Sequence, residues 1–312
     1  MAKTHHLDSA QVHYAWDNSL AHRLEIGPGD TVIFDTRDAA DRYYSRGSTH
    51  ADVLARGPFR GHPLTGPVRV RGARPGDVLV VEVLDMTPAA DFGWTAIRPG
   101  RGLLPEEDFP KPYLQIWDLS DGTHARSERR IAVPIEPFPG VMGVALDEPG
   151  QHSTMPPRKN GGNMDIRQLT AGSTLYLPVW VDGALFSAGD GHGAQGDGEV
   201  CVTAVEMMAR MTLRFGLERG RSLREPQFRT RGAPDARAQR GPCFVTTAHG
   251  PDLFASSQQA IRYMIEHLVA ERGLSREEAY ILSSVTVDLR ISEIVDAPNW
   301  IVSAFLPESV FV

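Results

Sequence analysis

The sequence is poor in cysteine, and this shortage excludes a class of protein. Cys201 and Cys243 are the only cysteines among 312 residues. A disulfide framework needs more cysteines in a shorter chain. We expect both thiols to be reduced and buried, and neither has a nearby sequence partner that would make it a nucleophile.

Long apolar runs and surplus positive charge are also missing. No segment approaches the roughly 20 apolar residues that span a membrane, and residues 1–6 contain no apolar signal core. We therefore expect a cytoplasmic protein that does not contact a membrane. The formal net charge is −7, which argues against nucleic-acid binding. Arginines are concentrated in residues 219–240 among glycine, proline and acidic residues, so we interpret this stretch as a solvated loop rather than a phosphate-binding patch.

The motifs of serine-dependent amidases are absent as well. The chain has no Gly-x-Ser-x-Gly elbow and no Ser-Gly-Gly-Ser run. If the protein is a hydrolase, activated water is the simpler nucleophile.

Short apolar runs broken by glycine and proline predict β structure over the N-terminal two-thirds of the chain. Residues 31–34 are a predicted strand. Residues 68–71 alternate apolar and charged side chains, residues 72–77 form a turn, and residues 78–83 return as a buried strand. We predict a hairpin-like unit here.

A second predicted β block surrounds a tight-turn dipeptide. Residues 175–181 and 184–188 flank Asp182-Gly183, which suits a hairpin turn. From residue 200 onward, alternation favours strand over helix. The strands predicted there cover residues 200–205, 206–210 and 211–215.

The pattern changes near residue 250. Apolar residues recur at helical spacing over residues 260–269, and Gly273 stands where a C-terminal cap belongs. Ser275 and Glu278 form a capping box for a second helix, and alternation over residues 285–291 then predicts a strand. The predicted fold is mainly β, with a sandwich or barrel over residues 1–217 and an α+β (α/β) part over residues 218–312. Residues 218–241 would be a loop or linker.

Glycine-rich segments contain most of the residues that could bind a metal. Residues 160–165 include Asp165, and residues 189–199 include Asp190 and His192. If the second segment is extended, Asp190 and His192 project to one face of a sheet. A carboxylate and an imidazole there suit Zn²⁺ or a similar divalent ion. The alternative is a structural loop in which Asp caps a turn.

These residues support a hydrolytic mechanism. We predict that Asp190, His192 and Asp165 bind a metal, which would polarise an amide carbonyl and lower the pKa of a bound water. Glu199 would act as general base and return the proton to the leaving ammonia. For Glu199 the alternative is a salt-bridged residue at the end of a strand. Asp38, just after a predicted strand, is a second catalytic candidate, with a turn residue as the alternative.

Asn163 and Asp197 are the candidates for substrate binding, since they lie in the same glycine-rich segments. We interpret His62, in the segment 62–67, as a structural histidine.

Motifs across most of the chain resemble those of the acetamidase/formamidase family. They occur in order along the chain, and the last is the most specific. The motifs are residues 62–67 with 72–79, residues 138–145, residues 161–165, and residues 189–192 with 195–199.

This resemblance implies an all-β N-terminal part, a smaller α/β part and a homo-oligomer. It implies hydrolysis of short aliphatic amides, such as formamide or acetamide, to a carboxylate and ammonia. It also implies a divalent metal at the Asp/His/Glu loop, with zinc expected and calcium as the alternative. Gly191 stands where the resemblance leads us to expect a larger residue, which predicts a looser or larger pocket.

Alternatives of a different kind stay open. The same metal and water could hydrolyse a cyclic amide, a ureido compound or a larger amide. The protein could also be a non-catalytic β-rich binding or assembly protein whose Gly/Asp loop is structural or holds Ca²⁺.

Overall fold

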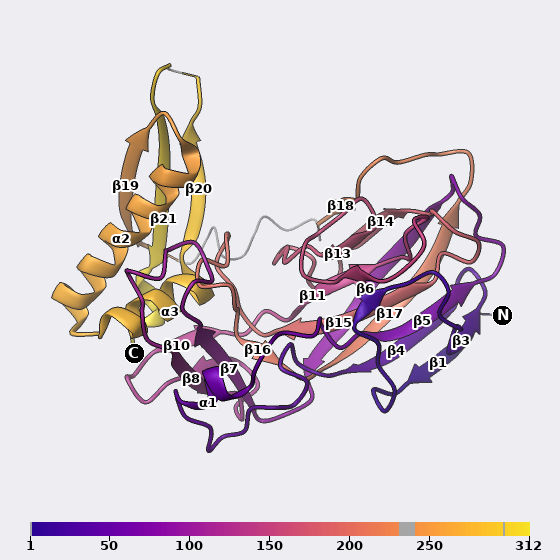
Figure 1. Ribbon diagram of the computed structural model, residues 1–312, viewed down its shortest axis with the longest axis horizontal. Helices are drawn as coiled ribbons and strands as arrows, with labels where there is room; N and C mark the ends of the chain where they lie inside the picture. The colour runs from indigo at the N-terminus through magenta and orange to yellow at the C-terminus, as the bar shows by residue number, and fades with distance from the viewer. Residues whose placement is uncertain (1, 231–240, 296) are drawn as a thin grey trace.

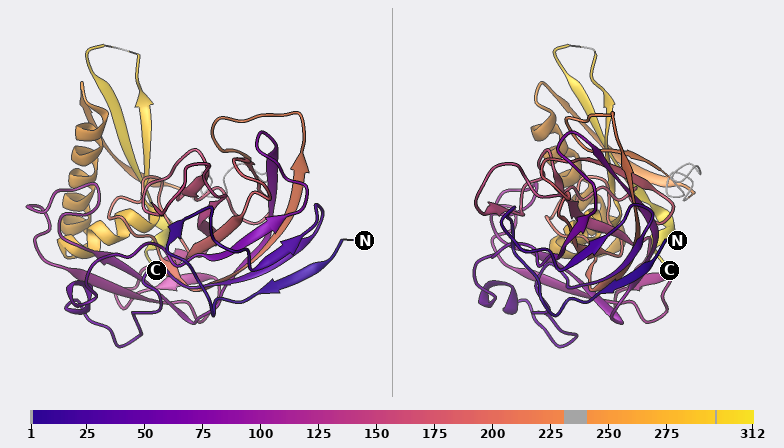
Figure 2. Two further views of the ribbon diagram at one scale, coloured as in Figure 1. Left: turned by 45° about the vertical axis from the view of Figure 1, so that its right-hand side comes forward. Right: turned by 90° about the vertical axis from the view of Figure 1, so that its right-hand side faces the viewer.

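The computed structural model describes residues 2–230, 241–295 and 297–312. The fold is mainly β with an α+β part at the C-terminus, so the predicted fold class is confirmed (Figure 1). Packed sheets form the N-terminal part. Figure 2 shows the C-terminal helices and a small sheet rising from one end of these packed sheets.

The first sheet has the strand order β1-β4-β17-β6-β14-β18. Only the pairing of β1 with β4 is parallel among the described strands of this sheet. Alternate residues of β4 are buried, which explains its sequence pattern. The strands are β1 (Thr4–Leu7), β4 (Thr31–Thr36), β17 (Ala209–Glu218), β6 (Val78–Pro88), β14 (Thr174–Pro178) and β18 (Gln227–Arg229).

The second sheet has the order β10-β9-β8-β7-β16-β15-β11-β13, with β5 pairing β15 and β3 pairing β5. It packs on the first sheet through fully buried aromatic rings: Phe186 lies 5.9 Å from Phe34 and 5.0 Å from Phe215 between ring centroids. The strands are β3 (Leu24–Ile26), β5 (Thr65–Val70), β7 (Phe92–Ile97), β8 (Tyr113–Asp118), β9 (His124–Arg126), β10 (Ala132–Pro134), β11 (Phe138–Gly143), β13 (Gly161–Asn163), β15 (Phe186–His192) and β16 (Glu206–Met207).

Both predicted hairpins are wrong, because the chain crosses between the sheets at these turns. β5 lies in the second sheet and β6 in the first, so residues 72–77 connect the layers. β14 and β15 are likewise in different sheets, and the crossing after Asp182-Gly183 uses left-handed conformations at Ala184 and Leu185. A turn dipeptide specifies local geometry and not the sheet to which the chain returns.

The predicted strand over residues 200–205 is also wrong, because this segment is a loop. Val200 and Cys201 are buried next to α3 (Arg276–Thr286) rather than paired in a sheet, and Val202 is exposed. The Tyr280 hydroxyl of α3 donates a hydrogen bond to the Val200 carbonyl, and the Cys201 amide donates to Ser284. Strand structure at residues 206–210 and 211–215 is confirmed by β16 and β17.

The C-terminal part combines α2 (Leu253–Arg272) and α3 with the strand order β19-β21-β20. α2 ends at Gly273 with φ 63°, and the capping box of Ser275 and Glu278 is present, as predicted. The following strand begins only at Asp288, because α3 continues to Thr286. The strands are β19 (Cys243–Gly250), β20 (Asp288–Glu293) and β21 (Trp300–Pro307), and short elements elsewhere are β2 (Ala15–Trp16), β12 (His152–Ser153), α1 (Asp52–Ala55) and η1 (Glu308–Val310).

The cysteines differ in environment. Cys201 is buried, as predicted, and burial raises the pKa of its thiol to about 11. Cys243 is exposed because it begins the edge strand β19, so the prediction of burial is wrong there.

The predicted linker over residues 218–241 contains β18, which pairs with β14. The interpretation of its arginines as a solvated loop falls partly on residues 231–240, which lie outside the described residues. The division at residue 217 stays a prediction. In the described part of the chain, no helix is long and apolar enough to cross a membrane.

Candidate active site

Strand β15 carries both Asp190 and His192, as the sequence predicts. His192 Nε2 lies 3.4 Å from Asp190 Oδ2, and the two side chains are only 1% and 3% exposed. Asp190 adopts φ 57°, a left-handed conformation that is uncommon outside glycine. The strand therefore directs a carboxylate and an imidazole to one buried point.

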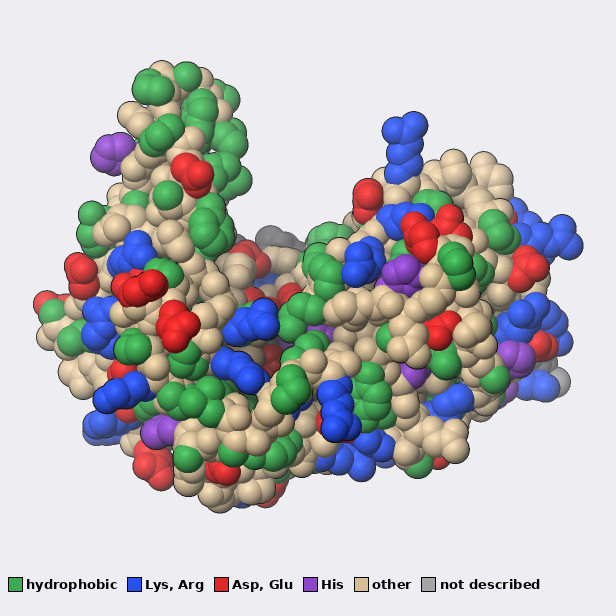
Figure 3. Space-filling model, viewed as in Figure 1, with side chains coloured by type: hydrophobic (Ala, Val, Ile, Leu, Met, Phe, Trp, Pro, Cys, Tyr) green, Lys and Arg blue, Asp and Glu red, His purple; other side chains and the backbone are tan. Residues whose placement is uncertain are grey.

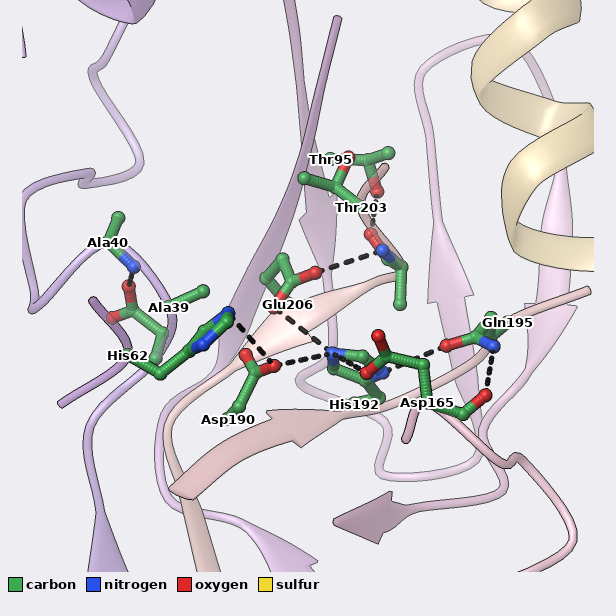
Figure 4. A network of polar contacts seen from close by, with 12 residues as sticks. Ala39, Ala40, His62, Thr95, Asp165, Asp190, His192, Gln195, Thr203 and Glu206 are labelled. Atoms are coloured by element: carbon green, nitrogen blue, oxygen red, sulfur yellow. Dashed lines mark hydrogen bonds and ion pairs between the residues drawn. The ribbon is translucent and has the colours of Figure 1, made fainter. Parts of the chain in front are cut away.

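Further carboxylates surround the same nitrogen (Figure 4). Glu206, paired across the sheet with His192, places Oε2 3.4 Å from His192 Nε2. Its Oε1 accepts a hydrogen bond of 2.9 Å from the Ala204 amide. Asp165 follows β13 and places Oδ1 4.0 Å from His192 Nε2.

Glu199 stands at the edge of this cluster. A carboxylate oxygen of Glu199 and the ligand atoms of Asp165 and His192 all lie within 4.8 Å of one another. Glu199 and Asp165 also adopt positive φ, at 43° and 49°. Non-glycine residues in such conformations gather at functional sites. The structure thus brings together Asp165, Asp190, His192 and Glu199, all of which are predicted site residues.

Burial and neighbouring charges shift the pKa values of these acids in opposite directions. Burial raises the pKa of Asp165 to about 7 and that of Glu206 to about 8. Burial, and then the charge of Asp165, raise the pKa of Glu199 well above its usual range. Burial alone would also raise the pKa of Asp190, but His192 and His62 hold it below its ordinary value. Carboxylates this close need protons or a cation between them.

The residues fit a divalent cation. Asp165 Oδ1, Asp190 Oδ1, Glu206 Oε2 and His192 Nε2 are buried and make no hydrogen bond to any residue that the structure describes. Buried polar atoms are normally hydrogen-bonded, and an imidazole with carboxylates is a donor set for zinc or a similar ion. A cation would satisfy these atoms together.

Gln195 orients the histidine. Its Nε2 donates a 2.7 Å hydrogen bond to the Asp165 carbonyl, so its Oε1 must be the atom that faces His192 Nδ1 at 3.0 Å. Because that oxygen only accepts, Nδ1 carries the proton in the neutral imidazole. The lone pair of Nε2 then points to the carboxylates, as metal ligation requires.

Gly140 and Gly191 both lie near the cluster, but a side chain would meet the cluster only at residue 140. A Cβ on Gly140 would lie 2.8 Å from His192 Cε1 and 2.9 Å from oxygens of Asp165 and Asp190. Residue 140 must therefore lack a side chain for the cluster to form. A Cβ on Gly191 would instead lie 2.6 Å from Ala209 Cβ, on the packed side of the strand. The prediction that Gly191 enlarges the pocket is wrong.

The cluster opens into a cavity of about 490 Å³. Figure 3 shows a hollow in the middle of the molecule, over the region of β15 and β16, with Lys or Arg side chains at its edge. Carboxylates of the cluster, aromatic rings and arginines share the lining. The main side chains are Tyr44, Arg56, Phe59, His62, Trp94, Arg98, Arg101, Met155, Asn163, Asp165, Asp190, Glu199 and Glu206.

The other predicted site residues lie in different places. Asn163 lines the cavity, and its buried Oδ1 has no hydrogen bond within the described ranges. Asp197 forms a 2.8 Å ion pair with Arg167. Asp38 is buried, and its carboxylate accepts hydrogen bonds from backbone amides. Neither Asp197 nor Asp38 is among the described residues that line the cavity, so their roles stay predictions.

His62 and Glu206 belong to the site but are not among the predicted functional residues. His62 Nε2 lies 3.7 Å from Asp190 Oδ2 and His62 lines the cavity, so it borders the site, and its interpretation as a structural histidine stays a prediction. The only sequence signal for His62 was its place in the first family motif. Glu206 interrupts an apolar run, and a buried acid in such a run needs a partner, but no glycine motif marks it.

Comparison with known proteins gives the family. A profile of the Acetamidase/Formamidase family matches residues 1–153 and 148–312. The chain is 28% identical to a formamidase of Methylophilus methylotrophus, over 96% of this chain and 89% of that protein. It is 27% identical to an acetamidase of Mycolicibacterium smegmatis, over 67% of this chain and 66% of that protein.

Solved structures agree with this family. A γ-lactamase from Delftia acidovorans superposes with a TM-score of 0.90 at 26% identity, covering 99% of this chain and 93% of that one. A predicted acetamidase/formamidase from Thermoanaerobacter tengcongensis superposes with a TM-score of 0.69 at 28% identity, covering 99% and 97%. The chain therefore belongs to the acetamidase/formamidase family, as its motifs predict.

Proposed function

We propose that this protein hydrolyses a small amide to a carboxylate and ammonia with the help of a divalent cation. The observation that carries the proposal is the buried cluster of His192 and carboxylates, with unsatisfied polar atoms, at a cavity. The formamidase and acetamidase relatives support the reaction class. They also argue against a non-catalytic binding protein.

Asp165, Asp190, Glu206 and His192 would hold the cation. Zinc is the proposed ion because the donor set includes an imidazole nitrogen, whereas Ca²⁺ prefers oxygen ligands throughout. When bound, the ion would polarise the amide carbonyl and lower the pKa of a water molecule.

Glu199 is the proposed general base. It is half-buried at the edge of the cluster and lines the cavity. Its carboxylate lies within 4.8 Å of the ligand atoms of Asp165 and His192, where it would accept a proton from the attacking water and then return it to the leaving nitrogen. Asn163 Oδ1, which lacks a partner in the described part of the chain, would accept a hydrogen bond from the substrate amide N–H.

A cyclic or larger amide is a second candidate substrate. The cavity of about 490 Å³ is within the size range of sites for drug-sized ligands, and formamide or acetamide would fill only a fraction of it. The close superposition on a γ-lactamase supports the same candidate. Open-chain and cyclic amides would share the cation site and differ in their contacts with the cavity wall.

The test is ammonia release from formamide and acetamide, together with ring opening of a γ-lactam, by the wild type and by Glu199→Gln. We expect hydrolysis by the wild type and a large loss of kcat in Glu199→Gln with metal content unchanged. Full kcat in the variant would remove Glu199 from the mechanism. A wild type that releases no ammonia from formamide, acetamide or succinamate and opens no γ-lactam would contradict the proposed function.

We also propose that the protein is a homo-oligomer, as the family resemblance implies. Exposed apolar side chains of the C-terminal part, including Ile291 at 57% and Ile294 at 50%, support an association surface. Light scattering coupled to size-exclusion chromatography would give the mass, and a mass of 34.2 kDa would contradict the proposal.

A further inference from the structure

The cavity lining combines side chains of opposite charge. Its acidic lining residues all belong to the cluster around His192. The same cavity is also lined by Arg56, Arg98 and Arg101. These arginines come from different segments: Arg56 directly follows α1, and Arg98 and Arg101 follow β7.

Backbone carbonyls hold the two inner guanidinium groups in place. Arg56 Nη2 donates to the Ala39 carbonyl at 2.9 Å, and Arg98 Nη1 donates to the Gly57 carbonyl at 3.0 Å. A guanidinium has five N–H donors, so several remain for a ligand or water. Carbonyls orient these groups without neutralising their charge.

Among the described residues, the arginines that line the cavity form no ion pair, unlike other enclosed arginines. Arg37 pairs with Asp41 at 2.8 Å, and Arg167 pairs with Asp197 at 2.8 Å. Within residues 2–230, 241–295 and 297–312, Arg56 and Arg98 form hydrogen bonds to carbonyls and no ion pair. A half-buried guanidinium that lines a cavity and forms no ion pair with a carboxylate is well suited to an anionic ligand.

Aromatic side chains form part of the wall of the same cavity. The rings of Tyr44 and Trp94 lie 4.7 Å apart between centroids, and the Arg56 guanidinium carbon lies 5.9 Å from the centre of the Phe59 ring. All of these side chains line the cavity. A molecule that matches this lining has a reactive amide, a short apolar spacer and an anionic group.

On the basis of the proposed amide hydrolysis, we infer that the substrate is an amide, open-chain or cyclic, that carries a carboxylate bound by Arg56, Arg98 and Arg101. Without these arginines, the carboxylates of the cluster would repel such a substrate. Hydrolysis of an open-chain member adds water across the C–N bond and yields a dicarboxylate and ammonium.

The test compares succinamate with succinamide, which have the same carbon chain but differ in charge. We expect the wild type to have a higher kcat/KM for succinamate. In Arg98→Gln the ratio of kcat/KM for succinamate to kcat/KM for succinamide should fall by about tenfold or more, which is the effect of a lost charge-assisted hydrogen bond. Arg74→Gln is the matched control, because Arg74 is exposed and does not line the cavity. Its ratio should equal that of the wild type.

The inference would be overturned if the wild type preferred succinamide, even if it hydrolysed both amides. It would also be overturned if Arg98→Gln had the same succinamate-to-succinamide ratio of kcat/KM as the wild type. If no amide is hydrolysed, the proposed function fails, and calorimetric titration with succinamate then decides the anion site separately. Binding that weakens about tenfold in Arg98→Gln supports the site, and absence of binding to the wild type overturns it.

Discussion

The acidic residues of the cavity lining (the acidic end) and its arginines (the arginine end) are held in different ways. The acidic end is carried largely by paired strands, β15 and β16, and its His192 is 1% exposed. The arginine end is carried by segments that follow α1 and β7, and Arg101 is exposed there. Reactive groups held by a sheet keep their geometry, whereas binding groups on connecting segments can vary. We therefore expect mutations at the acidic end to abolish chemistry, and mutations at the arginine end to change substrate choice.

The largest effect should follow from removing the imidazole. His192→Ala should lower kcat/KM for acetamide by at least about 10³-fold, because a Lewis acid contributes several kcal/mol to transition-state stabilisation. Its metal content, measured by mass spectrometry of the purified protein, should fall as well. His124→Ala is the control, because His124 lies outside the cluster and the cavity lining. Equal activity in both variants would disprove the metal site.

Arg167, which forms ion pairs, should contribute more to the free energy of unfolding than Arg98, which forms none among the described residues. Arg167→Leu breaks ion pairs with Asp197 and Asp288, and it should lower the free energy of unfolding by about 3 kcal/mol, because it leaves Asp288 buried without that partner. Arg98→Gln should change that free energy by under about 0.5 kcal/mol, since no ion pair of Arg98 within the described residues is lost. Urea denaturation measures both. Equal losses would mean that Arg98 is a structural residue.

Gly140 tests how closely the acidic end is packed. Gly140→Ala places a methyl group 2.9 Å from carboxylate oxygens of Asp165 and Asp190. It should weaken zinc binding about 10- to 100-fold, the range seen when the surroundings of metal ligands are disturbed. Gly47→Ala is the control, because its nearest neighbour lies at 4.0 Å. Competition with a chelating dye measures the affinity, and unchanged affinity in Gly140→Ala would show that the cation binds elsewhere.

The smallest effect is expected at the rim of the arginine end. Arg101 is exposed and lies closer to solvent than the half-buried Arg98. Arg101→Gln should therefore reduce the succinamate-to-succinamide ratio only about two- to fivefold, in keeping with the weak contribution of exposed charges. The effect should shrink in high salt. A loss larger than that in Arg98→Gln would reverse the proposed order of these contacts.

Local patterns predicted part of this site. Asp190 and His192 could be predicted from the sequence because alternate residues of a strand share a face. Asp165 and Glu199 could be predicted because they lie in glycine-rich motifs. Glu206 could not be predicted in this way, because its contact with His192 depends on the pairing of strands β15 and β16. The arginine end was missed for the same reason, since Arg56 and Arg98 meet only through tertiary folding.

The fold shows the same division between local and non-local information. The caps of α2 and α3 were predicted correctly, because a helix end is specified by residues a few positions apart. Both predicted hairpins failed, because the partner of a strand in a layered β fold can lie far along the chain. β6, for example, pairs with β14 and β17 rather than with the preceding β5.

The central claim is that a cation held by Asp165, Asp190, Glu206 and His192 supports amide hydrolysis. The most direct test is to strip metal from the wild-type protein with a chelator, measure ammonia release from acetamide or succinamate, and then add zinc stepwise. We predict that stripping abolishes hydrolysis and that activity returns in proportion to bound zinc. Full hydrolysis by protein shown to be free of metal would contradict this claim.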